Sequence, residues 1–207
     1  MGTTRKLRKK YVGPSHPWRA SRIAEETSLQ KEYGLKNKKE IWRARAVLRK
    51  FTTQTKVLIS NRGTKQGQLE EKQMMARLSH LGLLQENAKL EEVLALNVRN
   101  ILDRRLQTLV HKQAFSLTPT QARQFITHGH ITINGKKVDV PSFLVPHGIE
   151  FMIAFNPNST IAKEDHPERS KEKKNREKNE VKEVPEEIKE LKELEIIEKT
   201  VGAEVVQ

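Results

Sequence analysis

The stretch from Asn97 to Ile153 constrains the fold most, because its local signals agree with one another. Apolar residues at helical spacing follow Asn97 and predict a helix that runs to about Lys112. Thr118 opens a capping box, is followed directly by proline, and predicts a second helix that ends at Gly129. Two short helices in tandem are therefore expected.

A β-hairpin is expected directly after the second helix. Ile131 and Ile133 alternate with a polar residue, and Asn134-Gly135 is a strong signal for a two-residue hairpin turn. Lys136-Lys137 opens the return strand, and the apolar run 149–155 predicts a further strand. The expected fold class is α+β: a mostly helical N-terminal half, then this small two-helix plus β-hairpin module, then a charged C-terminal tail.

Several polar side chains of this stretch lie off its apolar stripes and are expected to face solvent. They offer many hydrogen-bond donors beside few acids, which favours an oxyanion-rich polymer such as RNA over a small metabolite. These candidate RNA-binding residues are Arg104, Arg105, Arg123, Gln124, His128, Thr132, Asn134, Lys136 and Lys137.

Four short motifs mark the same stretch: Arg104-Arg105 with Gln107, Gln121-Ala122-Arg123, Gly129-His130-Ile131 and Asn134-Gly135. Together they resemble the RNA-binding fold named after ribosomal protein S-four. The resemblance implies RNA binding and adds Gln107, Gln121 and His130 to the candidate residues. That module also occurs in tRNA synthetases, pseudouridine synthases and heat-shock RNA-binding proteins, so it implies an activity rather than one protein.

Positive charge is concentrated at the front of this 207-residue chain, whose formal net charge is +13. Residues 1–50 carry 15 Lys and Arg against 4 Asp and Glu, whereas residues 161–207 carry 11 against 14. Clustered positive charge is typical of proteins that bind polyanions. The first eleven residues offer little to bury and are expected to be disordered without a partner, although a solvated or nuclear-targeting tail is the alternative. The candidate RNA-binding residues of this arm are Arg5, Lys6, Arg8, Lys9 and Lys10.

A longer amphipathic helix is predicted from Asn37, with Glu40 completing a capping box. Its apolar face holds Ile41, Ala44, Leu48, Phe51 and Leu58. A charged helix face is usually only solvated, but almost no acids follow Glu40 on this helix, which favours phosphate contact. The candidates here are Arg43, Arg45, Arg49 and Lys50.

Two shorter helices complete the predicted N-terminal half. One covers residues 18–33, with Trp18, Ile23 and Leu29 as its expected anchors, and the other covers residues 68–81. Three blocks of this half, PSHPWRASRIAEE, EYGLKNKKEIWRAR and LSHLGLL, resemble the archaeal and eukaryotic type of ribosomal protein S-four. With the central stretch, this resemblance covers roughly residues 5–160.

The resemblance implies a structural protein of the small ribosomal subunit that binds the 5′ region of its rRNA. It further implies a part in subunit assembly and decoding accuracy, contacts with neighbouring ribosomal proteins, and mRNA as a further partner at the channel through which it enters. Bacterial relatives often carry a cysteine cluster for zinc, but this chain has no cysteine, so that site is not expected.

No catalytic constellation, cofactor motif or metal site is expected. His128 and His130 could suggest a metal, but no third ligand is near them in sequence, and such sites need three or four. An RNA-modifying enzyme or an RNA chaperone that uses the same module is the alternative function. No apolar run reaches 18 residues and no signal peptide is visible, so a cytoplasmic, ribosomal location without membrane contact is expected.

Four segments are predicted along the chain. Residues 1–17 form a basic arm ordered by its partner, and residues 18–96 form a helical rRNA-binding domain. Residues 97–160 form the RNA-binding module, and residues 161–207 form a charged and largely disordered tail. A marginal helix is expected within the tail from Pro185 to Lys199.

Overall fold

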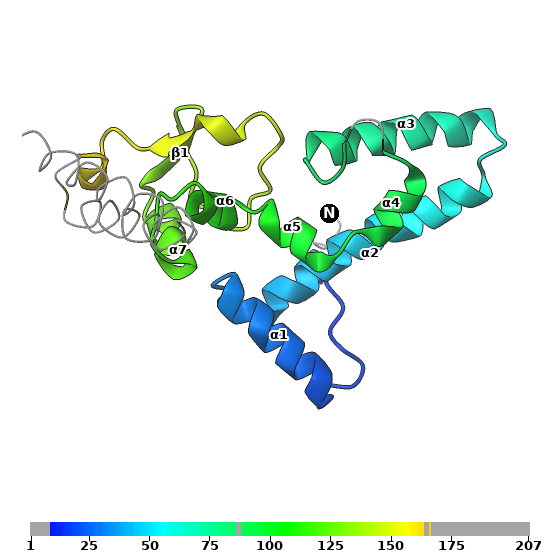
Figure 1. Ribbon diagram of the computed structural model, residues 1–207, viewed down its shortest axis with the longest axis horizontal. Coiled ribbons are helices and arrows are strands. Elements are labelled where there is room, and N and C mark those ends of the chain that lie inside the picture. Colours follow the sequence, from blue (N-terminus) through cyan, green and yellow to red (C-terminus); the bar gives the residue numbers. More distant parts are fainter. Residues whose placement is uncertain (1–8, 86–87, 164–165, 167–207) are drawn as a thin grey trace, which may run out of the picture. The chain divides into compact units, whose positions relative to one another are not determined.

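A computed structural model describes residues 9–85, 88–163 and 166 of the chain (Figure 1). The chain divides into two units, Met1–Ser159 and Thr160–Gln207. The second unit contributes one described element, the short 3-10 helix η2 (Thr160–Ala162). The predictions for Arg5, Lys6, Arg8 and a helix over residues 185–199 lie outside the described residues.

Four helices form the N-terminal half: α1 (Ala20–Glu32), α2 (Lys38–Ser60), α3 (Lys65–His80) and α4 (Leu90–Ala95). The long helix α2 contacts each of the other three (Figure 1). In the figure, α1 meets one end of α2, while α3 and α4 lie along its other part. The predicted helical character of this half is confirmed.

Helix α2 is long because its apolar face serves two separate cores. Toward its N-terminal end, Ile41 and Ala44 pack in a cluster with residues that follow α1, including Tyr33. Toward its C-terminal end, Phe51 and Leu58 pack with buried residues of α3 and α4. The predicted apolar face is confirmed, and α2 links the two cores.

Two details of these helices differ from the sequence-based prediction. Helix α3 begins at Lys65 rather than near residue 68, because Thr64 caps it by accepting a hydrogen bond from the amide of Gly67. Helix α1 begins at Ala20, after Trp18. The indole of Trp18 is 90% exposed, so the prediction that it anchors the helix is wrong.

The module (α5 to β3, residues 98–155) begins with three helices: α5 (Val98–Asp103), α6 (Leu106–Lys112) and α7 (Pro119–Thr127). The first predicted helix is thus two helices. The backbone turns extended at Arg105, which forms a β-bridge with Leu144, and the amide of Leu106 donates to the carbonyl of Phe143 at 2.8 Å. These two contacts with a distant segment break the helix.

The module ends in a three-stranded antiparallel sheet, with the strand order β2-β1-β3. The strands are β1 (Ile131–Ile133), β2 (Lys136–Lys137) and β3 (Ile153–Phe155). Asn134 and Gly135 both have positive φ, of 50° and 72°, as a two-residue hairpin turn requires, so the predicted hairpin is confirmed. Strand β3 is shorter than predicted, because a 3-10 turn, η1 (Glu150–Met152), precedes it.

Helices of the described ranges all fall short of the length or the apolarity that a membrane span requires.

Candidate nucleic-acid interface

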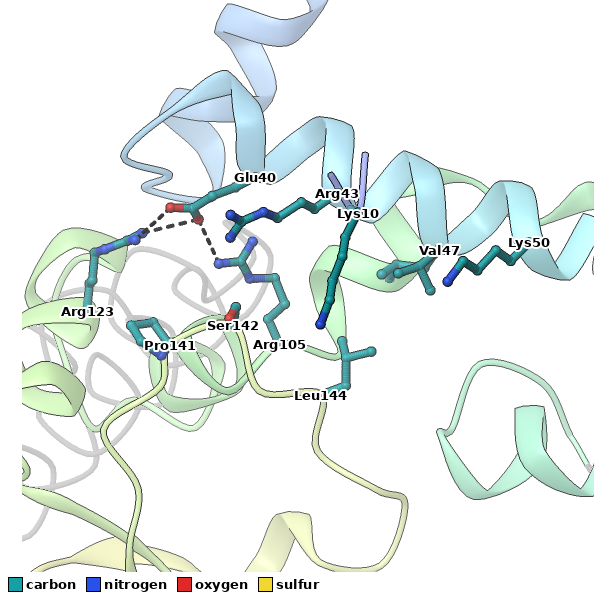
Figure 2. A pocket seen from close by; sticks show the side chains of 12 residues that line it. Lys10, Glu40, Arg43, Val47, Lys50, Arg105, Arg123, Pro141, Ser142 and Leu144 are labelled. Carbon is teal, nitrogen blue, oxygen red and sulfur yellow. Dashed lines mark hydrogen bonds and ion pairs between the residues drawn. The ribbon is translucent and has the colours of Figure 1, made fainter. Parts of the chain in front are cut away.

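An ion-pair network joins α2 to the module (Figure 2). Glu40, in the first turn of α2, faces two arginines that reach it from the module. The Oε2 atom of Glu40 lies 2.7 Å from Nη2 of Arg105, and its Oε1 atom lies 2.6 Å from Nη2 of Arg123. One carboxylate therefore pairs with two guanidinium groups.

This network is shielded from solvent. The side chain of Arg105 is 6% exposed, that of Glu40 13%, and that of Arg123 25%. Burial disfavours the charge on Glu40, but hydrogen bonds from Arg123 and Arg105 outweigh it and lower the pKa of this carboxyl. Burial also lowers the pKa of Arg105 against the opposing hydrogen bond with Glu40, yet a guanidinium stays charged in proteins.

The network corrects three predictions made from the sequence. Glu40 does not complete a capping box with Asn37, because its carboxylate is engaged by the two arginines. Arg105 does not face solvent, because it is buried against Glu40. Arg123 is only partly exposed, for the same reason.

Gln107 is buried beside this network and ties three segments together. Its Nε2 atom donates to the carbonyls of Tyr33, Gly34 and Pro119 at 3.2, 3.0 and 2.8 Å. Its Oε1 atom accepts from Nη1 of Arg123 at 3.3 Å. Gln107 thus links the end of α1 to the start of α7, and its burial keeps it away from any RNA at the surface.

Arg104 forms a second junction, on the other side of the break between α5 and α6. Its Nη1 atom lies 2.6 Å from Oε1 of Glu150, and its Nη2 atom donates to the carbonyl of Val145 at 2.9 Å. Its guanidinium also packs against Gly82, just after α3. Arg104 was predicted to face solvent, but its side chain is mostly buried and holds the loop before β3.

A cleft of about 340 Å³ opens beside the Glu40 network (Figure 2). Figure 2 shows Arg43, Val47 and Lys50 on α2, with Lys10 reaching down from the N-terminal segment toward Leu144. Among the described residues that line this cleft, Glu40 is the one acid and five are cations: Lys10, Arg43, Lys50, Arg105 and Arg123. Lys10, Arg43 and Lys50 are exposed. The cleft therefore carries a surplus of positive charge that suits phosphate groups.

The remaining candidates fall into three groups: residues of a second groove, other exposed residues, and residues that are partly or fully buried. Arg45 and Arg49 line a separate groove between α2 and residues 12–15. The exposed candidates outside both hollows are Lys9, Gln124, His128, Asn134, Lys136 and Lys137. The partly or fully buried ones are Gln121, His130 and Thr132.

These three buried or half-buried candidates have internal partners. Thr132 was predicted to face solvent, but it is buried in the sheet and its hydroxyl donates to the carbonyl of Ala154. The Oε1 atom of Gln121 accepts from the amide of Leu117 and so helps to cap α7. Nδ1 of His130 lies 2.7 Å from Oγ of Ser159.

The rings of His128 and His130 stack, with centroids 6.0 Å apart. Within the described ranges, no three His, Asp or Glu side chains gather closely enough to hold a metal ion.

Glu40 is the important residue that the sequence-based prediction assigned wrongly. It is followed by a stretch without any acid, from Ile41 to Leu69. Its partners lie 65 and 83 residues away along the chain, so no local pattern could have revealed them. Arg22, which lines the second groove, was not predicted as a site residue at all.

Comparison with known proteins gives the family to which the chain belongs. The S4 domain matches residues 104–149. A small ribosomal subunit protein uS4 from Methanococcus aeolicus is 50% identical over 171 residues, which cover 82% of this chain and 96% of the relative. The protein of the same name from Methanothermobacter thermautotrophicus is 46% identical, and the match covers 79% of this chain and 95% of the relative. The one from Picrophilus torridus is 47% identical, and the match covers 82% of this chain and 93% of the relative. The chain belongs to the uS4 family. The predicted resemblance is confirmed.

The S4 domain of this uS4 chain begins at Arg104, the residue at which the predicted helix breaks. Glu40 lies outside the domain and pairs with two arginines inside it. The Glu40 network therefore joins the S4 domain to the helical half of uS4.

Proposed function

We propose that this chain is a structural rRNA-binding protein of the small ribosomal subunit and has no enzymatic role. The observation that carries the proposal is the cleft, whose described lining residues include five cations and a single acid. Its walls come from α2 and from the S4 domain, so one RNA backbone in the cleft would contact both halves of the protein. The relatives' name, small ribosomal subunit protein uS4, supports the same function.

In the proposed mechanism, the protein presents a fixed set of charges to a folded RNA. Lys10, Arg43 and Lys50 are exposed and neutralise phosphates, which releases counterions from the RNA. The ion pairs with Glu40 fix the side chains of Arg105 and Arg123 before RNA binds. Binding therefore costs little conformational entropy at these two residues. The exposed hairpin residues Asn134, Lys136 and Lys137 offer further donors outside the cleft.

The finer parts of the proposal come from the family relation. The RNA is the 5′ region of the small-subunit rRNA, and the consequences of binding are subunit assembly and decoding accuracy. Neighbouring small-subunit proteins are further partners, and mRNA is one at the channel through which it enters. The place of action is the ribosome in the cytoplasm.

The test compares binding to a transcript of the small-subunit rRNA 5′ region with binding to an unrelated folded RNA of equal length. We expect strong preference for the rRNA, and retention of the protein on small subunits through a high-salt wash. Equal affinity for both RNAs would favour an RNA chaperone instead. The double variant Arg43→Gln, Lys50→Gln should lose affinity, whereas the control Lys72→Gln, Lys89→Gln changes exposed lysines outside the cleft lining.

A further inference from the structure

Trp18 is an exposed aromatic residue at a well-defined turn. Its side chain is 90% exposed, which is unusual for the largest apolar ring. The turn is held in place because Nη2 of Arg22 donates to the carbonyl of Pro17 at 2.8 Å. Helix α1 begins two residues after Trp18. The backbone of Trp18 is therefore held on one side by the bonded carbonyl of Pro17 and on the other by the start of α1.

A groove adjoins Arg22, the residue that holds this turn, and Trp18 is not among its lining residues. Residues 12–15 form one wall, and Trp42, Arg45 and Arg49 of α2 form the other. Arg22 of α1 also lines it. The ring of Tyr11 contacts the ring of Trp42, with centroids 6.0 Å apart, which fixes the N-terminal segment along α2. In Figure 1 this segment runs from beside α2 to the start of α1.

The charge of the groove is positive. Glu26, the nearest acid, is 1% exposed and accepts a hydrogen bond from Nε1 of Trp42 at 3.1 Å. It also lies 3.5 Å from Nε of Arg22 and 3.9 Å from Nη1 of Arg45. The charge of Glu26 is thus buried and paired inside the protein. Arg49 has no acidic partner within the described ranges. The walls come from two stretches without acids, residues 9–24 and 41–69.

We propose that Trp18 stacks on an unpaired base of the rRNA, while the backbone phosphates next to that base lie against Arg22, Arg45 and Arg49. Aromatic rings beside cations are the usual platform for unpaired nucleotides, because every base has a π-face. This inference rests on the proposed function and adds a second contact to it. The groove shares no lining residue with the cleft at Glu40.

A protein partner is the less favoured occupant. An apolar pocket that received Trp18 would also have to cover three arginines, and it would need acids to do so. RNA supplies a flat apolar surface and negative charge within one molecule. The ring and the cations of this surface therefore match RNA as a single ligand.

The test uses the fluorescence of Trp18 in the full-length chain. The chain has two tryptophans, so Trp42→Phe leaves Trp18 as the single emitter. We expect a transcript of the rRNA 5′ region to quench this emission and to protect it from acrylamide, and a blunt RNA duplex to bind without quenching. Trp18→Ala should weaken rRNA binding at least about fivefold, whereas Trp18→Phe should keep most of the affinity.

A second measurement gives the emission of Trp18 even if Trp42→Phe fails to fold. The difference in emission between the unmodified chain and Trp18→Phe isolates the same signal. Bound rRNA with unchanged Trp18 emission would overturn the stacking proposal and leave the proposed function standing, as would equal quenching by the duplex. Emission that changes only when other small-subunit proteins are added would assign Trp18 to a protein contact instead. Failure of the proposed function would appear separately, as loss of rRNA preference in the unmodified chain.

Discussion

At the scale of single residues, Glu40 has the largest effect on the charges around it. Its carboxylate accepts hydrogen bonds from Arg105 and Arg123, and within the described part of the chain it is the one acid that lines the cleft. Without it, the buried Arg105 would keep its charge with no acid to balance it. Such an ion is costly, because a buried charge without a partner cannot be solvated by water.

Glu40→Gln should therefore lower the free energy of unfolding by about 3 kcal/mol, the low end for loss of one partner from a buried ion pair. The amide can still accept a hydrogen bond but carries no charge. Urea unfolding followed by circular dichroism measures the change. Glu25→Gln is the matched control, because Glu25 is exposed on α1, and it should change stability by less than about 0.5 kcal/mol. Equal stability of both variants would contradict the buried pairing.

The difference in stability between the unmodified protein and Glu40→Gln has a defined pH dependence. The pKa of Glu40 is lowered in the folded state from the ordinary value of 4.5, so its contribution to stability is complete above that value. The contribution is lost as pH falls from 4.5 through the folded pKa. Urea midpoints of the unmodified protein and Glu40→Gln should differ by a constant amount above about pH 5 and should converge below it. A gap that widens in acid would exclude this carboxylate as the cause.

At the scale of elements, two helix ends are shaped to receive the module. Gly34 follows α1 with φ +57°, and a Cβ atom there would lie 2.8 Å from Cβ of Pro119, the first residue of α7. Gly82 follows α3 with φ +63°, and a Cβ atom there would lie 2.8 Å from Cζ of Arg104. Both glycines end a helix and also leave room for the module.

Gly34→Ala should lower the free energy of unfolding by more than about 1 kcal/mol, because it adds strain at positive φ and a clash with the backbone of Pro119. Gly82→Ala should lower the free energy of unfolding by less, since the added Cβ atom meets the end of the Arg104 side chain and not backbone. The control is Gly63→Ala, where a Cβ atom meets nothing within 4 Å and φ is not left-handed, and it should be neutral or slightly stabilising. Chemical unfolding measures the free energy of unfolding of the three variants. An equal loss for Gly63→Ala would show that close contacts at Gly34 and Gly82 are not the cause.

The elements also show which features a sequence can predict. The hairpin at Asn134-Gly135 and the cap at Thr118 depend on residues next to one another, and both were predicted. The break at Arg105 depends on Leu144, whose bridge fixes an extended backbone in the middle of a helical pattern. Glu40 pairs with partners 65 and 83 residues away, so no local pattern reveals them. The candidate site was therefore predicted in its residue types but not in their exposure.

At the scale of the whole molecule, the exposed cations decide how binding responds to salt. Each phosphate neutralised by a lysine or arginine contributes about 0.7–0.9 to the slope of log affinity against log salt. Arg105 and Arg123 are already paired with Glu40, so they add less to this slope than Arg43 and Lys50. The exposed and the buried arginines thus differ in function although both line one cleft.

Arg43→Gln with Lys50→Gln should reduce the slope of log affinity against log salt by about 1.5. Filter binding to the rRNA 5′ region from low to moderate salt measures the slope. Lys72→Gln with Lys89→Gln removes the same charge outside the cleft and should leave the slope almost unchanged. A slope that is the same for all three proteins would exclude the cleft as a phosphate site.

The dependence of the S4 domain on Glu40 limits how freely this domain can be exchanged between proteins. A graft of residues 98–155 onto another chain would carry Arg105 and Arg123 without the carboxylate of Glu40, and Gln107 without the carbonyls of Tyr33 and Gly34. A host would have to supply an acid at the same place, or the graft would need uncharged residues at both arginines. The domain of this chain is thus portable only together with its counter-charge.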